Sequence, residues 1–254
     1  GALVQHLDSK THTIPKLQTT MSDMSVEPKE NFEFHLTVHP DSDTLLYAFA
    51  QHLQKAVAGR VTNEVVKPRA TYPRELYGKH PRQPMLTGNM YGTISIVKQR
   101  VLDLAQDMRN YGIDIVRTKI EALASTNYVE HKTYFESHFK ITTSSVGEYN
   151  EVALLVLPAG GHVSYNIHDR VPHPIVTFRV YDSAKTLYEV TDLHVEKLKS
   201  LGYTIAQSPH YECAIYDDNV LLDSDWIFEG TDTTRVITDP SKIVLFPTPP
   251  NISI

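Results

Sequence analysis

The chain has 254 residues, of which 41% are hydrophobic and 21% are charged, and its formal net charge is -6. This length suits one large or two small globular cores, and the composition excludes general disorder. A single cysteine, Cys213, excludes an intramolecular disulfide framework and a zinc site built from cysteines alone. No apolar run approaches the roughly 20 residues that span a bilayer, so we expect no membrane association and a cytoplasmic or nuclear location.

The two ends of the chain are expected to be peripheral. Residues 1–31 are polar and lack sustained periodicity, which predicts a loosely ordered N-terminal arm. Residues 231–254 hold several prolines, which predicts an extended tail with one short strand at residues 243–246. Between them the sequence divides into two halves, residues 32–128 and residues 129–230.

Each half begins with a predicted strand that has one polar face. Side chains alternate across a strand, so in residues 33–38 three polar side chains oppose three apolar ones, and residues 134–141 repeat this pattern. The polar faces carry Glu33, His35 and Thr37 in the first strand and Glu136, His138 and Lys140 in the second. Each strand is therefore predicted to be half core and half candidate site.

The elements that follow have the same order in both halves. After the first strand come a helix over residues 44–57, a basic irregular segment, a helix over residues 93–111 and a strand over residues 113–121. After the second come a helix over residues 148–157, strands at residues 162–165 and 175–181, a helix over residues 183–201 and a strand reaching residue 216. Apolar residues at helical spacing, with Gly112 and Gly202 just past two helix ends, support the long helices. We predict an α+β fold in which two ferredoxin-like β-α-β-β-α-β halves form one bilobal domain, although the inner strands of the first half have no clear pattern.

The irregular segment at residues 60–82 is unusually basic. It holds six lysines and arginines, Arg82 among them, against two glutamates, which is a local excess of four positive charges. Such a segment fits either a phosphate-binding region or a solvated loop. Pro68, Pro73 and Pro81, with Pro84 just after the segment, exclude a regular helix here, so we expect a flap beside the site.

The polar strand faces should come together, because the last strand of a ferredoxin-like half lies beside the first. This would place Arg117, Lys119 and Glu121 beside the strand of His35. It would likewise place His210 and Glu212 beside the strand of His138. Unpaired burial of a charge costs several kcal/mol, so these groups should form a polar network, line a hydrated cleft or bind a ligand.

Two short segments resemble a known catalytic motif. His35-Leu36-Thr37-Val38 and His162-Val163-Ser164-Tyr165 each fit the His-x-Thr/Ser-hydrophobic signature. With its bilobal layout, the chain is therefore similar to the two-histidine phosphoesterases, in which each lobe contributes one motif. The chain departs from this family in the longer spacing between the motifs, and His138-Phe139-Lys140-Ile141 competes for the second position.

The resemblance implies a phosphoesterase that acts on a cyclic phosphate or phosphodiester of a nucleotide or RNA end. It implies paired histidines as general base and general acid, with no cofactor. The residues support such chemistry independently, because histidine titrates near neutral pH and cations or hydroxyls can hold phosphoryl oxygens. The expected catalytic residues are His35, His138 and His162. The expected substrate-binding residues are Thr37, Ser164, Lys140, Arg117, Lys119 and Arg82.

Two other interpretations remain open. Glu136 and His138 share one strand face, as do His210 and Glu212, and together they could bind zinc, iron or manganese in a metal-dependent hydrolase or oxygenase. Lys140 on the same face would repel such a cation. The third interpretation is a non-catalytic ligand- or partner-binding protein, because residues 211–226 alternate aspartates with aliphatic residues in a pattern that also suits an interaction surface.

Overall fold

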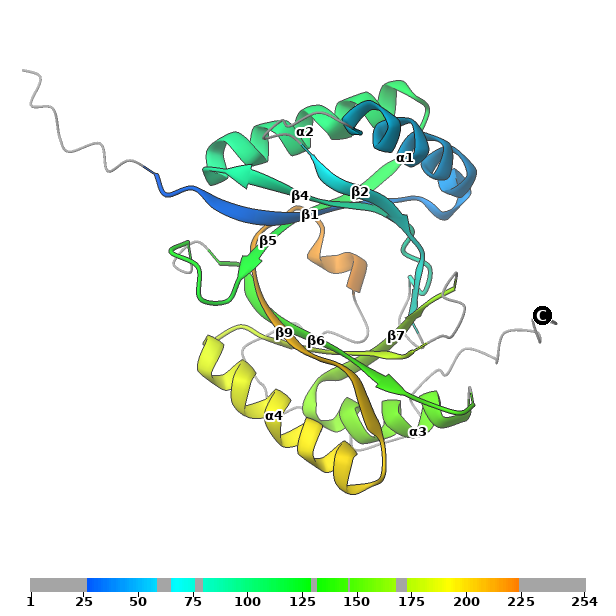
Figure 1. Cartoon of the computed structure of the whole chain (residues 1–254), viewed down its shortest axis with the longest axis vertical. Coiled ribbons are helices and arrows are strands. Elements are labelled where there is room, and N and C mark those ends of the chain that lie inside the picture. The colour runs from blue at the N-terminus through cyan, green and yellow to red at the C-terminus, as the bar shows by residue number, and fades with distance from the viewer. Residues whose placement is uncertain are drawn as a thin grey trace, which may run out of the picture.

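The computed structural model describes residues 27–58, 65–75, 80–128, 132–145, 147–167 and 173–223. These residues form one nine-stranded sheet, with helices on its outer side (Figure 1). The strand order is β2-β4-β1-β5-β9-β6-β8-β7-β3, and neighbouring strands are antiparallel. The predicted α+β class is confirmed.

The elements of the first half are β1 (Glu30–Val38), the 3-10 turn η1 (Pro40–Ser42), α1 (Asp43–Val57), β2 (Val66–Thr71), β3 (Pro73–Glu75), β4 (Met85–Gly92), α2 (Ile94–Asn110) and β5 (Ile115–Leu123). Those of the second half are β6 (Tyr134–Thr142), α3 (Gly147–Val156), the 3-10 turn η3 (Leu157–Ala159), β7 (Gly161–Asn166), β8 (Ile175–Val180), α4 (Ala184–Ser200) and β9 (Thr204–Asp217). A last 3-10 turn, η4 (Val220–Asp223), follows β9.

Within each half the strands have the order of a ferredoxin-like unit. The first half runs β2-β4-β1-β5, and the second runs β7-β8-β6-β9, so in both the first and last strands of the half are neighbours. β5 pairs with β9 and thereby joins the two halves into one sheet. The sheet is thus continuous from one half to the other.

A second connection between the halves curls the sheet into a barrel. β2 and β3 follow each other in the chain, yet they lie at opposite edges of the sheet, where β3 pairs with β7. Figure 1 shows the resulting ring of strands, with α1 and α2 on one outer side and α3 and α4 on the other. The expectation of an irregular flap was wrong for this part of the segment, because residues 66–75 are strands that close the barrel.

Two apolar cores lie between the outer face of the sheet and the helices. In the first half, Phe34, Leu36 and Val38 are fully buried against α1 and α2. In the second half, Phe139 and Ile141 belong to the corresponding core. Full burial of such a side chain stabilises the fold by about 1.5–3 kcal/mol. The polar residues alternate with these positions, so they face the inside of the barrel. The sequence predicted this alternation, although it did not predict the barrel.

The helix boundaries also follow from the sequence. Thr93 and Ser183 begin α2 and α4, and the hydroxyl of each accepts a hydrogen bond from the backbone N–H three residues later. Gly112 and Gly202 follow these helices with φ of +91° and +93°, a conformation that glycine adopts without steric cost.

The predicted arm is described only from residue 27, and the predicted tail strand at residues 243–246 lies outside the described residues. Among the described helices, none combines the length and the apolar character needed to cross a bilayer.

Candidate active site in the barrel

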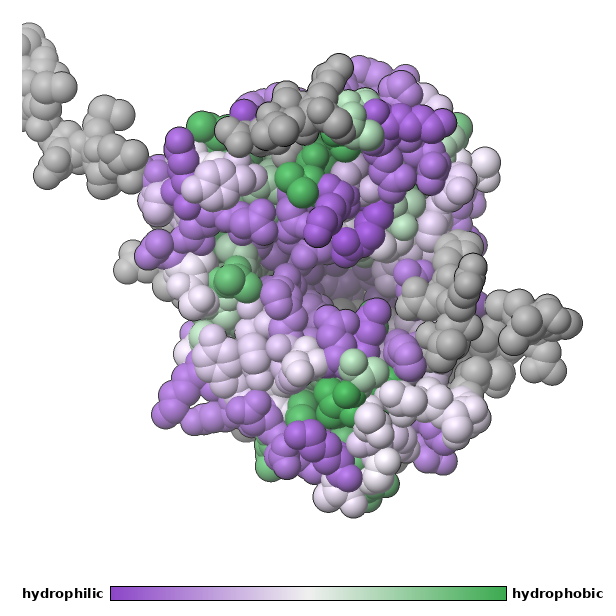
Figure 2. Space-filling model, in the orientation of Figure 1, coloured by the Kyte–Doolittle hydropathy of each residue, from purple (hydrophilic) through white to green (hydrophobic). Residues whose placement is uncertain are grey.

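The inner face of the sheet surrounds a cavity of about 600 Å³. This volume lies within the range of small-molecule sites in proteins. In the space-filling view, hydrophilic residues gather around a hollow near the middle of the molecule (Figure 2). The predicted site residues that line the cavity are His35, Thr37, Arg117, Lys119, Glu136, His138, Lys140, His162, Ser164, His210 and Glu212. Arg82 lies elsewhere and pairs with Asp43, with Nη2 and Oδ2 2.6 Å apart.

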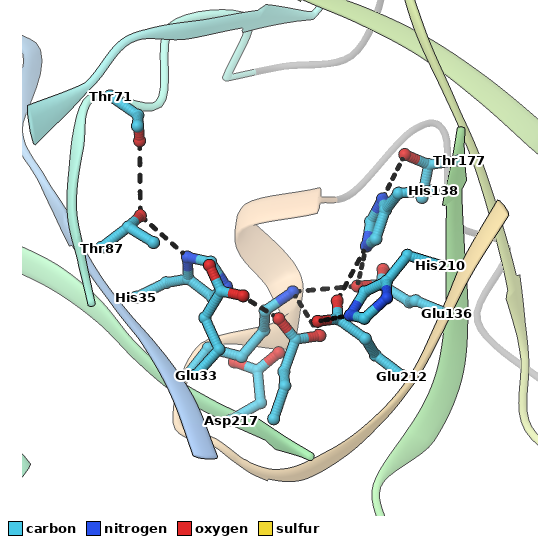
Figure 3. Close-up of polar contacts among 12 residues, drawn as sticks. Glu33, His35, Thr71, Thr87, Glu136, His138, Thr177, His210, Glu212 and Asp217 are labelled. Atoms are coloured by element: carbon cyan, nitrogen blue, oxygen red, sulfur yellow. Dashed lines mark hydrogen bonds and ion pairs between the residues drawn. The ribbon is translucent and has the colours of Figure 1, made fainter. Parts of the chain in front are cut away.

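His35 is fixed on both sides of its ring. It stands on β1 opposite Thr87 of β4, and its Nδ1 shares a hydrogen bond of 3.1 Å with the Thr87 hydroxyl. Its Nε2 lies 2.8 Å from Oε2 of Glu121 on β5. Thr71 extends this chain of polar contacts from β2 to Thr87 (Figure 3).

His138 has the same arrangement in the second half. It stands on β6 opposite Thr177 of β8, and its Nδ1 shares a hydrogen bond of 2.9 Å with the Thr177 hydroxyl. Its Nε2 faces Oε2 of Glu212 at 3.5 Å and Oε2 of Glu136 at 3.7 Å. Burial opposes the charged form of His138, but these two carboxylates outweigh it and raise the pKa of His138. His35 and His138 are therefore equivalent residues of the two halves.

Lys119 connects the two histidine networks. Its Nζ lies 2.9 Å from Oε1 of Glu121 and 2.9 Å from Oε2 of Glu136, so it joins a carboxylate of each half. Burial would lower the pKa of Lys119, but the two glutamates raise it well above its ordinary value. Arg179 of β8 holds the other oxygen of Glu136, with Nε 2.7 Å from Oε1. Lys119 is thus a permanent ammonium group inside the barrel.

One end of the barrel interior is occupied by η4, which Figure 1 shows inside the ring of strands. Asp223 of η4 accepts contacts from Arg117 at 2.8 Å and from Arg179 at 2.9 Å. Arg117 also pairs with Asp217 at 2.6 Å, and the Tyr134 hydroxyl donates to the same carboxylate at 2.6 Å. The two arginines come from different halves, so the turn after β9 fastens the halves together.

His162 belongs to a different environment from His35 and His138. It lies on β7 and contacts Glu75 of β3, so this pair stands where the barrel closes. Both side chains are buried. Burial lowers the pKa of His162 to about 3 and raises the pKa of Glu75 well above its ordinary value. His162 therefore remains neutral near pH 7.

The two segments that match the phosphoesterase motif do not occupy equivalent strands. His35 is on β1, the first strand of its half, whereas His162 is on β7, the second strand of its half. The strand register also shows that the two motifs are not equivalent. His162 lies opposite Thr177, and Thr87, the equivalent of Thr177 in the first half, lies opposite Arg69. The two motifs therefore do not follow the symmetry of the barrel.

Glu121, Glu136 and His138 are the described residues that best fit a metal site, since one ligand atom of each lies within 4.8 Å of the others. The predicted set of Glu136, His138, His210 and Glu212 overlaps it in two residues. Lys119 opposes metal binding, because its ammonium lies 2.9 Å from both glutamates of the group. A divalent cation would have to displace Lys119 or share these carboxylates with it.

No family model matches the sequence, and no curated protein matches it. Among solved structures, the chain is similar to an anthrone oxidase-like protein, with 9% identity, a TM-score of 0.23 and coverage of 76% of this chain and 93% of that chain. It is also similar to a protein named as a monooxygenase from Fusobacterium nucleatum, with 9% identity, a TM-score of 0.28 and coverage of 76% and 95%. At this level of similarity neither activity is transferred to the present chain.

The phosphoesterase interpretation was wrong. The charges in the cavity are unsuited to an anion. Two of the four cations expected to hold phosphate are each bound by two carboxylates: Lys119 by Glu121 and Glu136, and Arg117 by Asp217 and Asp223. A third, Arg82, pairs with Asp43 away from the cavity. A phosphodiester beside Lys119 or Arg117 would also face these carboxylates, whose charge opposes the binding of an anion.

Sequence reasoning missed several residues of the site. Thr87 and Thr177 lie on strands opposite the histidines, and only the strand register brings them there. Glu75 and Asp223 come from a three-residue strand and a single turn. Arg179 alternates with buried apolar residues on β8, and this alternation was the one signal that indicated an inward position.

Proposed function

We propose that the protein is an enzyme that binds a small organic molecule inside the barrel and transfers a proton on it through His138. The observation that carries this proposal is the position of the His138 imidazole. Its Nε2 faces two carboxylates at 3.5 and 3.7 Å, which exceeds the length of about 2.7–3.2 Å of a normal hydrogen bond. Its side chain is 31% exposed, so a molecule in the cavity can reach the ring.

The surroundings of His138 suit proton transfer. Thr177 holds Nδ1 and thereby fixes the orientation of the ring, which leaves Nε2 directed toward the carboxylates and the cavity. When His138 accepts a proton, Glu136 and Glu212 stabilise the imidazolium that forms. His35 repeats this arrangement and is proposed as the second proton-transfer residue, with Glu121 as its partner.

A deuterium-exchange experiment tests the proposal and requires no assay of a specific product. The protein is incubated in D₂O with a set of small ketones, β-dicarbonyl compounds, phenols and amino ketones, and incorporation of deuterium at carbon is followed by mass spectrometry. We expect enzyme-dependent exchange in at least one compound and a reduction of at least about 100-fold in His138→Gln. His52→Gln, an exposed substitution on α1, is the matched control and should retain the rate. Equal rates in wild type and His138→Gln would refute the role of His138.

A metal-dependent oxygenase is a second candidate, supported by the spacing of Glu121, Glu136 and His138. Metal analysis of protein purified without chelators separates the two candidates. About one equivalent of zinc, iron or manganese, lost in His138→Gln, would favour the metal enzyme. Exchange that persists in the presence of a strong chelator would favour proton transfer by the histidines alone.

A further inference from the structure

The two halves differ at one chemically important position of their shared pattern. On β1 and β5, His35 lies opposite Lys119, and on β6 and β9, His138 lies opposite His210. The residue two positions after each partner is a glutamate, Glu121 in the first half and Glu212 in the second. The second half therefore has an imidazole where the first half has an ammonium.

The first half shows how an ammonium binds at this position. Lys119 Nζ lies 2.9 Å from Glu121 Oε1, beside the carboxylate that also pairs with His35. In the second half, His210 Nε2 lies 3.1 Å from Glu212 Oε1, and His138 faces the other oxygen of the same carboxylate. Glu212 thus pairs with His138, as Glu121 pairs with the equivalent His35. Unlike Glu121, it has no fixed cation from its own strand.

The charges of the interior leave Glu212 to titratable partners. Six carboxylates have buried side chains: Glu75, Glu121, Glu136, Glu212, Asp217 and Asp223. Burial raises the pKa of Glu75 well above its ordinary value, and the other five accompany three fixed cations, Lys119, Arg117 and Arg179, a difference of 5 − 3 = 2 negative charges. The two ion pairs of Glu212 are both with imidazoles, and among the described residues no lysine or arginine lies within ion-pair distance of it. Its charge is therefore balanced only when a histidine is protonated or when a cation enters the cavity.

The cavity also has an apolar wall. Met85 and Ile175 stand opposite the inward residues Thr37 and Lys140, and they line the same space as Glu212 and His138. A ligand that fits both parts has an apolar body and a cationic head. Resting on the proposed function, we propose that the substrate is a small organic amine, bound as its ammonium form at Glu212 in the way that Lys119 is bound at Glu121.

Three probes of equal shape test the charge of the ligand. Benzylamine, benzyl alcohol and benzoate carry a cationic, a neutral and an anionic head on the same apolar body. Binding to the full-length protein is measured by chemical-shift changes of the histidine side chains and by calorimetry. We expect benzylamine to bind at least about tenfold more tightly than benzyl alcohol, which corresponds to about 1.4 kcal/mol, and benzoate to bind most weakly.

The variant His210→Lys tests the equivalence of the two halves. It places an ammonium beside Glu212, as Lys119 is placed beside Glu121, so it should weaken benzylamine binding at least about tenfold. The position is suited to substitution because the side chain of His210 is 49% exposed. His52→Lys adds the same charge on the surface of α1 and should leave benzylamine binding unchanged.

Equal affinity for benzylamine and benzyl alcohol would overturn the inference, as would full benzylamine binding by His210→Lys. These binding results are separate from the deuterium-exchange test. Exchange that depends on His138, without a preference for benzylamine, would support the proposed function and refute the amine substrate. Amine binding at Glu212 without exchange would support the amine site and refute the proton-transfer function. The protein would then be a binding protein for cationic ligands.

Discussion

Lys119 and His210 stand at the same register of the two halves, but only Lys119 reaches a carboxylate of the other half. Its ammonium contacts Glu121, two residues along its own strand, and Glu136 on β6, whereas His210 contacts Glu212 alone among the carboxylates within ion-pair distance in the described residues. The same position therefore serves two purposes. In the first half it joins the halves electrostatically, and in the second it leaves a carboxylate with titratable partners.

Replacement of Lys119 by methionine should strongly destabilise the protein. Methionine retains much of the volume but removes the charge, so Glu121 and Glu136 lose a cation that each contacts at 2.9 Å. Breaking a buried ion pair in this way costs about 3–5 kcal/mol. Urea unfolding of wild type and variant measures the change.

Lys185→Met is the matched control for this substitution. Lys185 pairs with Glu189 on the surface of α4, and its side chain is 83% exposed. Such pairs contribute about 0–1 kcal/mol, so the control should remain close to wild type. A Lys119→Met variant as stable as Lys185→Met would show that the glutamates are balanced in another way.

The elements that could be predicted are those whose sequence pattern lies within the element itself. The helices of both halves and the strands of His35 and His138 follow from periodicity and end signals. β2, β3 and β4 could not be predicted, because prolines and charges in the first two and glycines at Gly88 and Gly92 in the third hide a strand pattern. Barrel closure could not be predicted either, since it depends on the pairing of β3 with β7.

The candidate site could be predicted in part. Alternation placed His35 and His138 on inward faces, and the ferredoxin-like order placed Lys119 and Glu121 beside the first of them. The choice of chemistry failed because a sequence does not show how charges pair. Arg117 and Lys119 were expected to hold phosphate, but each is bound by carboxylates, one of which, Asp223, comes from a turn far along the chain. The sequence shows how many charged residues there are, but it does not show which of them form ion pairs.

Thr177→Val should reduce turnover more than Thr87→Val does. Valine keeps the shape of threonine but removes the hydroxyl that holds Nδ1 of His138, so the ring loses its fixed orientation. We expect a loss of about tenfold or more in the deuterium-exchange rate, with little change in the free energy of unfolding. The smaller effect of Thr87→Val would follow from the greater distance of its hydroxyl to His35, 3.1 Å against 2.9 Å, and from the proposed secondary role of His35. The reverse order of the two variants would make His35 the main proton-transfer residue.

Asp223→Ala should destabilise the barrel by about 3 kcal/mol or more. Its carboxylate pairs with Arg117 and Arg179, whose side chains are 5% and 3% exposed, so both buried cations would lose a partner. The effect should appear as a lower urea midpoint with an unchanged m-value. Asp103→Ala removes an exposed hydrogen bond with Gln99 on α2 and should change the stability by less than about 1 kcal/mol. A small effect of Asp223→Ala would mean that η4 does not fasten the two halves.

The buried His162 should make the protein less stable in mild acid. The pKa of His162 is about 3 in the folded protein, because burial opposes its charged form, and its ordinary value is 6.5. Between these values the unfolded chain binds a proton that the folded chain does not, so the free energy of unfolding falls as the pH falls. The contribution of this one residue is roughly 1 kcal/mol for each pH unit below about 6.5.

His162→Gln isolates that contribution, since glutamine does not titrate. The charged and titratable groups that act on His162 from the packed elements are Glu75 on β3, Glu136 and His138 on β6, Arg179 on β8 and Asp223 on η4, and all of them remain in the variant. Unfolding free energies are measured by urea titration from pH 7.5 to pH 5. The variant should lose less stability over this range than wild type, by roughly 2 kcal/mol at pH 5, whatever its stability at pH 7.5. Parallel pH profiles would show that His162 takes up a proton in the folded barrel, and its contact with Glu75 would then be an ion pair.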